Sequence, residues 1–263
     1  MIAGAAIGWF HRRTQPDAVG PRFTEALLAR RPGTVVDAWS GGVMRIELAS
    51  GVYIDVRLRA LFNACQDDRS GCSAAISAAL DDVDRADRAT REPKRAMLRP
   101  AIVNEASSGF SLGYVTEPLV GRFELRYALV NGLAATFVTS AIADRLHLDR
   151  AALKAEALAA QHAEPVPELD ALPGSTAIFS VRSPGDPPAL LLDRERMKQF
   201  ATRLGTPRLY AAIPAPAALY LAKADATGAQ ALAQAMPAGG FDLLAYDVDA
   251  PDGAAMTIAP RTP

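Results

Sequence analysis

Apolar residues recur along the first part of the chain with two periods, one typical of helices and one typical of strands. Residues 21–31 and 73–91 carry apolar side chains at helical spacing. Between them lie three runs that alternate apolar and polar positions and are separated by Ser-Gly-Gly and Ala-Ser-Gly. This pattern predicts a helix, a three-stranded antiparallel meander, a short helix over 58–65 and a second long helix. The N-terminal part is therefore expected to form an α-β-β-β-α-α unit.

The second half of the chain opens with a strong β-hairpin pattern. Two β-rich runs flank Asn131-Gly132, a pair that accepts the positive φ angles of a type I′ turn. Further on, residues 194–204 repeat apolar positions at i, i+3, i+4 and i+7, and Gly205 follows as a helix-ending residue. Helices and strands follow one another without a regular βαβ repeat. The expected fold class is therefore α+β, with antiparallel sheets and packed helices.

A charged, proline-containing segment at 91–100 suggests a boundary between two domains. We expect a small α+β domain over 21–100 and a larger mixed α+β domain over 101–263. An apolar and basic N-terminal segment, residues 1–20, precedes them. The remaining elements expected in the larger domain are helices over 140–146, 149–162 and 228–236, and strands over 176–181, 189–193, 208–213, 218–224, 241–248 and 254–259.

Composition and charge exclude one class of function. The chain has 263 residues, half of them apolar, and a formal net charge of −1. A protein that binds nucleic acid by electrostatics carries a basic patch or a strongly basic domain, and neither is present in this sequence. We therefore expect no nucleic-acid partner.

The first ten residues, MIAGAAIGWF, are apolar and are followed by His-Arg-Arg. As a helix they would span about 15 Å, half of the roughly 30 Å hydrocarbon core of a bilayer. A signal peptide would show a charged region before the apolar run and a small-residue cleavage site, which are lacking. Three interpretations stay open: a segment that packs on the protein body, a weak membrane-surface anchor, or the end of a longer span. We expect a cytoplasmic protein with no integral membrane span, the alternative being a periplasmic or membrane-anchored one.

One short motif raises the question of catalysis. Gly109–Gly113 reads Gly-Phe-Ser-Leu-Gly and fits the G-x-S-x-G nucleophile elbow, with Ser111 as nucleophile. That elbow needs a helix after the serine, whereas Tyr-Val-Thr-Glu-Pro predicts a strand or a loop. The triad partners would be Asp144 and His147, which lie three residues apart on one predicted helix turn. Ser111 is thus the single catalytic candidate, and a flexible turn is the competing interpretation.

No pattern predicts a metal ion or another cofactor. The three histidines lack metal-binding spacing, and no phosphate-binding glycine motif is present. The stretch DVDAPDG (247–253) resembles the start of an EF-hand loop, but its glycine is one place late and Ile258 replaces the required glutamate. The acids of LDDVD (80–84) have arginines one turn further on or face solvent, as on a solvated helix face.

The two cysteines, Cys65 and Cys72, lie seven positions apart. On one continuous helix their Cα atoms would be about 10 Å apart, too far for a disulfide. The intervening Gln-Asp-Asp-Arg-Ser-Gly forms turns readily, however, so a disulfide across a corner between two helices is feasible. The spacing is not the C-x-x-C of thiol oxidoreductases. Two reduced cysteines, a structural disulfide, and a redox or metal role all stay open, because the compartment decides among them.

Five stretches together resemble the bacterial family called domain of unknown function 1444, the YtpQ-like proteins. The stretch VRLRAL stands where that family tends to read LDNLY. The resemblance covers nearly the full chain and implies the α+β architecture, but it implies no activity. The stretches are RFTEAL (22–27), GVYIDVRLRALFNAC (51–65), the segment 126–159, ALLLD (189–193) and LYAAIPAPAALYLAKA (209–224).

These patterns favour a non-enzymatic binding or protein-interaction module, whose antiparallel sheet offers an edge or a face to a partner protein. Whether the protein is an enzyme stays open, although no cluster of titratable residues converges in the sequence. The alternatives are a serine hydrolase that uses Ser111 and a disulfide-containing extracytoplasmic protein. Weak membrane association through the N-terminus also stays open.

Overall fold

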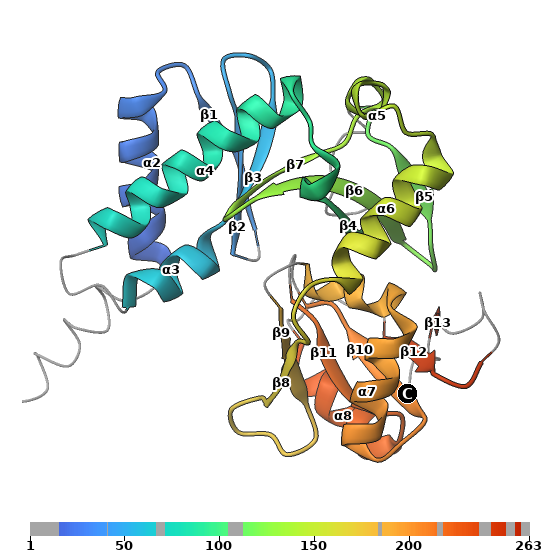
Figure 1. Ribbon diagram of the computed structural model, residues 1–263. Coiled ribbons are helices and arrows are strands. Elements are labelled where there is room, and N and C mark those ends of the chain that lie inside the picture. Colours follow the sequence, from blue (N-terminus) through green and yellow to red (C-terminus); the bar gives the residue numbers. More distant parts are fainter. Residues whose placement is uncertain are drawn as a thin grey trace, which may run out of the picture. The chain divides into compact units, whose positions relative to one another are not determined.

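The computed structural model describes residues 16–40, 42–66, 72–104, 113–183, 186–214, 218–236, 243–250 and 256–258. It confirms the α+β fold class, with one seven-stranded and one six-stranded antiparallel sheet (Figure 1). The chain forms two compact units. The first comprises Met1–Met97 and Ala128–Leu146, and the second comprises Leu98–Tyr127 and His147–Pro263.

The first unit contains the expected α-β-β-β-α-α order and adds a strand and a helix from further along the chain. Helices α2, α3 and α4 gather over the sheet, with α4 packed against β3 and β7 (Figure 1). The elements are α2 (Pro16–Arg30), β1 (Val35–Ser40), β2 (Val43–Glu47), β3 (Tyr53–Arg57), α3 (Leu58–Gln66), α4 (Ser73–Arg91), a 3₁₀ turn (Arg95–Met97), β7 (Ala134–Phe137) and α5 (Ser140–Leu146).

Period-two alternation in the strands builds the core of this unit. In β2 and β3, partly exposed residues alternate with fully buried ones, so Met44, Ile46, Ile54 and Val56 share one face. The helices cover that face with side chains such as Phe23, which is also fully buried. The positions of the helices are therefore determined by one continuous apolar core.

The first helix begins earlier than the sequence suggests. The prediction placed Pro21 in its first turn, but α2 begins at Pro16 and Pro21 lies inside it. Proline lacks an N–H and therefore removes one bond of the helical ladder. Pro21 is exposed, and Phe23 and Leu27 beyond it are fully buried, so packing of the apolar face holds the helix together across the proline.

The second unit contributes the six-stranded sheet, in the order β13-β12-β10-β11-β9-β8. The seven-stranded sheet has the order β1-β2-β3-β7-β6-β4, and β5 pairs with β6. The further elements are β4 (Leu98–Asn104), β5 (Thr116–Pro118), β6 (Phe123–Asn131), α6 (Arg150–His162), β8 (Glu168–Ala171), β9 (Phe179–Arg182), a 3₁₀ helix (Pro187–Leu192), α7 (Arg194–Leu204), β10 (Arg208–Ala212), β11 (Tyr220–Lys223), α8 (Ala226–Ala235), β12 (Leu244–Asp247) and β13 (Met256–Ile258).

Strand β10 shows how the six-stranded sheet is covered on both faces. Leu209 and Ala211 belong to the cluster that contains α7, whereas Ala212 belongs to the cluster that contains Leu232 of α8. Because successive side chains of a strand point to opposite faces, α7 and α8 pack on opposite sides of this sheet. Strand β10 is therefore buried on both faces.

Two expectations about the second half differ from the structure. Residues 189–193 were expected to form a strand, but Pro187–Leu192 is a 3₁₀ helix with prolines at its start. A proline fixes φ near the helical value and cannot donate to a strand ladder, which favours the helix. The expected second domain began at residue 101, whereas the first compact unit also includes Ala128–Leu146.

None of the helices in the described part of the chain combines the length and the apolar character needed to cross a membrane. The apolar residues 1–10 lie outside the described residues.

Candidate functional site

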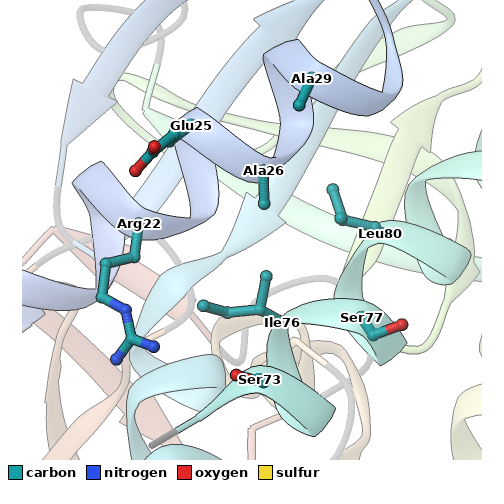
Figure 2. Close-up of a pocket in the computed structure, with 8 residues that line it drawn as sticks. All are labelled: Arg22, Glu25, Ala26, Ala29, Ser73, Ile76, Ser77 and Leu80. Atoms are coloured by element: carbon teal, nitrogen blue, oxygen red, sulfur yellow. The ribbon is translucent and has the colours of Figure 1, made fainter.

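Helices α2 and α4 lie side by side in the first unit and leave a groove between them, which we call the α2/α4 groove (Figure 2). Each helix contributes four residues spaced i, i+3, i+4 and i+7, which is the spacing of one helix face. The lining residues are Arg22, Glu25, Ala26 and Ala29 of α2 and Ser73, Ile76, Ser77 and Leu80 of α4.

Small side chains keep the groove open. Its volume is about 460 Å³, within the range of ligand-binding clefts. Ala26, Ala29 and Ser77 are too short to fill the space between the two helix backbones, and the buried core beneath prevents the helices from moving closer. Figure 2 shows Ala26, Ile76 and Leu80 facing one another between the helices. The result is an apolar floor between two rows of small residues.

Ion pairs tie the two helices together beyond one end of the groove. Arg30 Nη2 lies 2.7 Å from Asp81 Oδ1 and 2.5 Å from Asp84 Oδ2, and Arg31 contacts Asp84 at 2.6 Å and Asp87 at 3.0 Å. The hydrogen bond that Arg30 donates to Asp81 is the main cause that raises the pKa of Arg30. These cross-helix pairs set the spacing of α2 and α4 at this end.

The sequence predicted that the same acids pair within α4 on a solvated face. Asp87 does approach Arg91 of the same helix at 3.5 Å, but the closest partner of each of Asp81, Asp84 and Asp87 is Arg30 or Arg31. Asp82 and Asp87 are each only 6% exposed, so these two acids are not on a solvated face. The reason is that α2 ends in two arginines beside α4, which no spacing within α4 reveals.

A disulfide joins Cys65 of α3 to Cys72 at the start of α4, with their Cα atoms 4.7 Å apart. Cys72 is buried against the core and has a φ of 76°, a left-handed conformation that reverses the chain before α4. The groove residues Ser73, Ile76 and Ser77 follow within the next five positions. The disulfide therefore anchors the end of α4 that forms one wall of the groove.

We expect reduction of this disulfide to lower the free energy of unfolding of the first unit by about 2.5 kcal/mol, because an eight-residue loop is then no longer closed in the unfolded chain. Chemical denaturation with and without a phosphine reductant measures the difference. The double variant Cys65→Ala/Cys72→Ala is the control, since its stability should not respond to the reductant. Equal stability of the oxidised and reduced wild type would contradict the prediction.

The groove combines an apolar floor with polar groups along its edges. Ile76 and Leu80 are each 7% exposed and form its apolar floor, while Ser73 and Ser77 add hydroxyl groups along one edge. Arg22 extends toward the end where α4 begins (Figure 2). The lining residues include no thiol or histidine that could act as a nucleophile or a general base at neutral pH. An apolar group with a polar margin is the kind of ligand that matches these walls.

Two of the three residues that a serine hydrolase would need, Asp144 and His147, lie in the described part of the chain. Ser111 lies outside the described residues, and the next described element is strand β5 (Thr116–Pro118), not the helix that the elbow motif requires. Asp144 and His147 are both exposed at the end of α5, and His147 has a φ of 53°. Nothing in the described part of the chain assembles a triad.

The second unit contains a partly buried group of titratable residues. Lys154 Nζ lies 2.9 Å from Glu117 Oε2, and the fully buried Tyr127 donates its hydroxyl to Glu117 Oε1. Burial, together with the bond to Glu117, raises the pKa of Tyr127, so the phenol stays protonated. Burial also acts to raise the pKa of Glu117, but the bonds from Tyr127 and Lys154 outweigh it and lower that pKa overall. Tyr127 of β6 and Lys154 of α6 both bind the carboxylate of Glu117 in β5, so the three residues link these elements. Because that carboxylate is paired with both of them, it is not a free base.

The EF-hand-like stretch forms no metal site in the part that the structure describes. Asp247 accepts a hydrogen bond from the backbone N–H of Asp249, which is the main cause that lowers its pKa, and it also pairs with Arg208 at 2.9 Å. Residues 251–253 of the stretch lie outside the described residues. Across all described residues, no three His, Cys, Asp or Glu side chains gather as a metal ion would require.

The sequence identified both helices of the groove but not the groove itself. The apolar spacing predicts both helices, and Ser73 was expected as the N-cap of the second one, whereas the N-cap is Cys72 and Ser73 lines the groove. Short residues on the facing sides of two helices indicate a groove only when the helices are known to be neighbours. The resemblance to domain of unknown function 1444 stays a prediction. Compared with known proteins, the chain matches no family model, no curated protein and no solved structure at a significant level.

Proposed function

We propose that this protein is a non-enzymatic binding module and that its α2/α4 groove receives an apolar segment of a partner protein. The observation that carries the proposal is the pair of facing stripes, each at i, i+3, i+4 and i+7, with short residues on both walls and apolar residues on the floor. Amphipathic helices bind in grooves of this kind through anchors at the same spacing. The formal net charge of −1 supports a protein partner over a nucleic acid.

The edge of the seven-stranded sheet is a weaker candidate for the same role. Strand β1 lies at that edge, and Val35 and Val36 are 56% and 36% exposed. However, the strand pairing is irregular between Val36 and Ala38, and Asp37 adds an exposed charge at that point. Irregular pairing and charge are features that discourage strand addition at an edge. The groove is therefore the favoured docking surface.

The disulfide bears on the compartment in which the protein works. Disulfides persist in oxidising compartments and are rare in the cytosol. The Cys65–Cys72 bond thus supports an extracytoplasmic protein over the cytoplasmic one that was expected. Mass spectrometry of protein from its native host, alkylated before and after reduction, tests this point, and two free thiols in the unreduced sample would oppose it.

Site-specific cross-linking tests the proposed docking site. A photoreactive benzoyl-phenylalanine at Ser77 should attach to a partner through an apolar peptide, whereas the same group at Ala155, an exposed position on α6, should not. The partner is then purified and its affinity for the unlabelled protein is measured. We expect Ser77→Arg to weaken binding at least about tenfold, or about 1.4 kcal/mol, because the arginine brings a charge against the apolar floor of the groove.

The matched control for the affinity measurement is Ala78→Arg, which adds the same side chain to an exposed position of α4 that does not line the groove. This variant should bind as the wild type does. If Ser77→Arg and Ala78→Arg weaken the affinity for the partner equally, the added charge on α4, and not the groove, is the cause. Cross-links that are as frequent from Ala155 as from Ser77 would refute the groove as a docking site.

A further inference from the structure

We infer that the Cys65–Cys72 disulfide is a redox switch of the α2/α4 groove: the oxidised protein holds the groove in its binding form, and reduction weakens partner binding. This inference rests on the proposed function, since it adds regulation to the same docking site. The bond joins the end of α3 to the residue directly before α4, and the groove residues Ser73, Ile76 and Ser77 follow in the first two turns of that helix. The disulfide therefore acts at the point where one wall of the groove begins.

Cys72 has a backbone conformation that cysteine rarely adopts. Its φ is 76°, in the left-handed region, and among the described non-glycine residues only His147 shares a positive φ. Such a conformation carries strain and persists only where the surrounding structure enforces it. The side chain of Cys72 makes no capping hydrogen bond to α4, so the disulfide and the packing of this residue against the core hold it in place. Reduction removes the first of these two constraints.

Reduction also forces the two sulfur atoms apart. Bonded sulfurs lie closer together than two thiol sulfurs in van der Waals contact, so one of the two residues must move. The strain at Cys72 favours movement there. The N–H of Ile76 donates to the carbonyl oxygen of Cys72 at 3.0 Å and closes the first turn of α4. A shift of Cys72 therefore disturbs this turn and displaces Ser73 and Ile76, which line the groove.

The far end of α4 is held independently of the disulfide. Arg31 of α2 pairs with Asp84 at 2.6 Å and with Asp87 at 3.0 Å. These contacts lie beyond Leu80, the last residue of α4 that lines the groove. We therefore expect reduction to loosen the first turns of α4 and to leave its second half in place. The groove changes shape at one end while the helix as a whole stays folded.

The chemistry of the switch is thiol–disulfide exchange with a protein dithiol as the reductant. A thiolate of the reductant attacks the sulfur of Cys65, because Cys65 is partly exposed whereas Cys72 is buried. The S–S bond breaks, Cys72 leaves as a thiolate beside the positive end of the α4 dipole, and a mixed disulfide forms on Cys65. The second thiol of the reductant then attacks its own sulfur in the mixed disulfide and releases Cys65. In total two electrons and two protons pass to the cysteine pair, and the reductant becomes a disulfide.

An oxidising compartment keeps the bond closed, so the groove is in its binding form by default. Exposure to a reducing dithiol releases the partner. Because the two cysteines are seven positions apart, the cost of closing the loop between them is small and reoxidation restores the bond.

Hydrogen exchange of the full chain, oxidised and reduced by a phosphine, tests the conformational step without a partner. We expect the protection factor of the Ile76 amide to fall at least about fivefold on reduction, because the strained start of α4 is then released. The amides of residues 87–91 should keep their protection. The variant Cys65→Ala/Cys72→Ala is the control: its Ile76 amide should exchange as in the reduced wild type and should not respond to the phosphine.

The affinity for the partner tests the regulatory step. The partner captured through the cross-link from Ser77 is titrated with the oxidised and the reduced wild type. We expect reduction to weaken binding at least about fivefold, the lower end of ordinary coupling between two sites. Cys65→Ala/Cys72→Ala should bind with the weaker affinity under both conditions, which excludes an effect of the reductant on the partner. Because coupling is reciprocal, the partner should lower the equilibrium constant for reduction in a glutathione buffer by the same factor.

Three results would overturn the inference. Unchanged exchange at Ile76 would show that packing against the core holds the start of α4 without the disulfide. An equal loss of protection at both ends of α4 would assign the effect of the bond to the stability of the whole unit. A loss of protection with unchanged affinity would show a local change to which the partner does not respond.

The two proposals fail separately. If Ser77 cross-links a partner and reduction leaves the affinity for that partner unchanged, the redox switch is refuted and the binding module stands. If Ser77 and Ala155 cross-link with equal frequency in the oxidised protein, the binding module is refuted. That comparison is made without reductant, so it does not depend on how the disulfide responds.

Discussion

Replacing Arg196 by alanine is expected to lower the free energy of unfolding of the second unit by about 3–5 kcal/mol, the range measured when one member of a buried charged network is removed. Arg196 belongs to α7 and is only 4% exposed. Surface substitutions change stability by at most about 0.5 kcal/mol, so the expected loss is well outside that range.

The reason for this large effect lies at the end of α6. The last carbonyl groups of a helix have no partner within the helix. The guanidinium of Arg196 donates to four backbone oxygens at and just beyond this helix end: those of Gln161 (3.2 Å) and His162 (2.8 Å) in α6, and those of Glu164 (2.5 Å) and Pro165 (2.8 Å) in the segment that follows. It also pairs with the buried carboxylate of Asp193 at 3.1 Å. Alanine would leave these acceptors without their donor.

Chemical denaturation followed by circular dichroism measures the loss. Arg203→Ala is the matched control, because Arg203 lies on the same helix, is exposed, and should cost little. Arg196→Lys keeps the charge but lacks the planar fork of donors, so it should restore only part of the stability. A loss below about 1 kcal/mol for Arg196→Ala would show that water replaces the guanidinium, contrary to the prediction.

Local patterns explain which parts of the fold could be predicted. The helix over residues 194–204 and its end at Gly205, which has a φ of 68°, follow from apolar spacing and from the left-handed conformation that glycine accepts. The hairpin at Asn131-Gly132 follows from turn chemistry in the same way. Both depend on residues that are neighbours in sequence, which is why the sequence alone was sufficient.

Strands without a regular pattern could not be predicted in this way. Strand β4 (Leu98–Asn104) begins inside the segment that was read as a domain boundary, and β8 (Glu168–Ala171) is short and polar. Each is stabilised as a strand by a neighbouring element. Helix α6 packs on β4, and β8 pairs with β9 over four residues. Tertiary context outweighs local preference at these positions.

The candidate site depends even more on distant residues. The groove exists because α2 and α4, about fifty residues apart, pack as neighbours, with Arg30 and Arg31 paired to acids of α4. The spacing of the acids within α4 predicted partners on the same helix instead. The buried role of Arg196 was likewise beyond the sequence, because its acceptors lie more than thirty residues away.

Gly132→Ala is expected to lower the free energy of unfolding of the first unit by about 2.5–5 kcal/mol, from about 1–2 kcal/mol of left-handed backbone strain and about 1.5–3 kcal/mol of lost charged hydrogen bonding. Gly132 has a φ of 58°, and a Cβ there would lie 2.2 Å from Oδ2 of Asp82. That oxygen accepts the N–H of Leu133 at 2.8 Å, and Arg57 donates to the carbonyl of Gly132 at 2.5 Å. The carboxylate must therefore move, and the turn would lose its attachment to α4.

Gly51→Ala separates the two contributions to this loss. Gly51 has a φ of 75°, and a Cβ there would meet no atom within 4 Å, so only the backbone strain of about 1–2 kcal/mol should appear. The contact with Asp82 is tested by combining Gly132→Ala with Asp82→Ala, which removes the obstructing carboxylate. In that background the alanine should cost no more than it does at position 51. If the losses of stability caused by Gly132→Ala and Asp82→Ala simply add in the double variant, the proposed contact between the new Cβ and Asp82 is contradicted.

This hairpin also supports the proposed binding site. Asp82 lies two residues beyond Leu80, which forms part of the groove floor, so the carboxylate that holds the turn also fixes α4 at that point. Displacing it should shift Leu80 against α2 and weaken binding in the groove, whereas Gly51→Ala should leave the groove unchanged. The stability of a distant turn and the affinity of the groove are therefore expected to fall together in Gly132→Ala. Loss of stability with unchanged affinity would show that the ion pairs of Arg30 and Arg31 hold α4 in place without the hairpin.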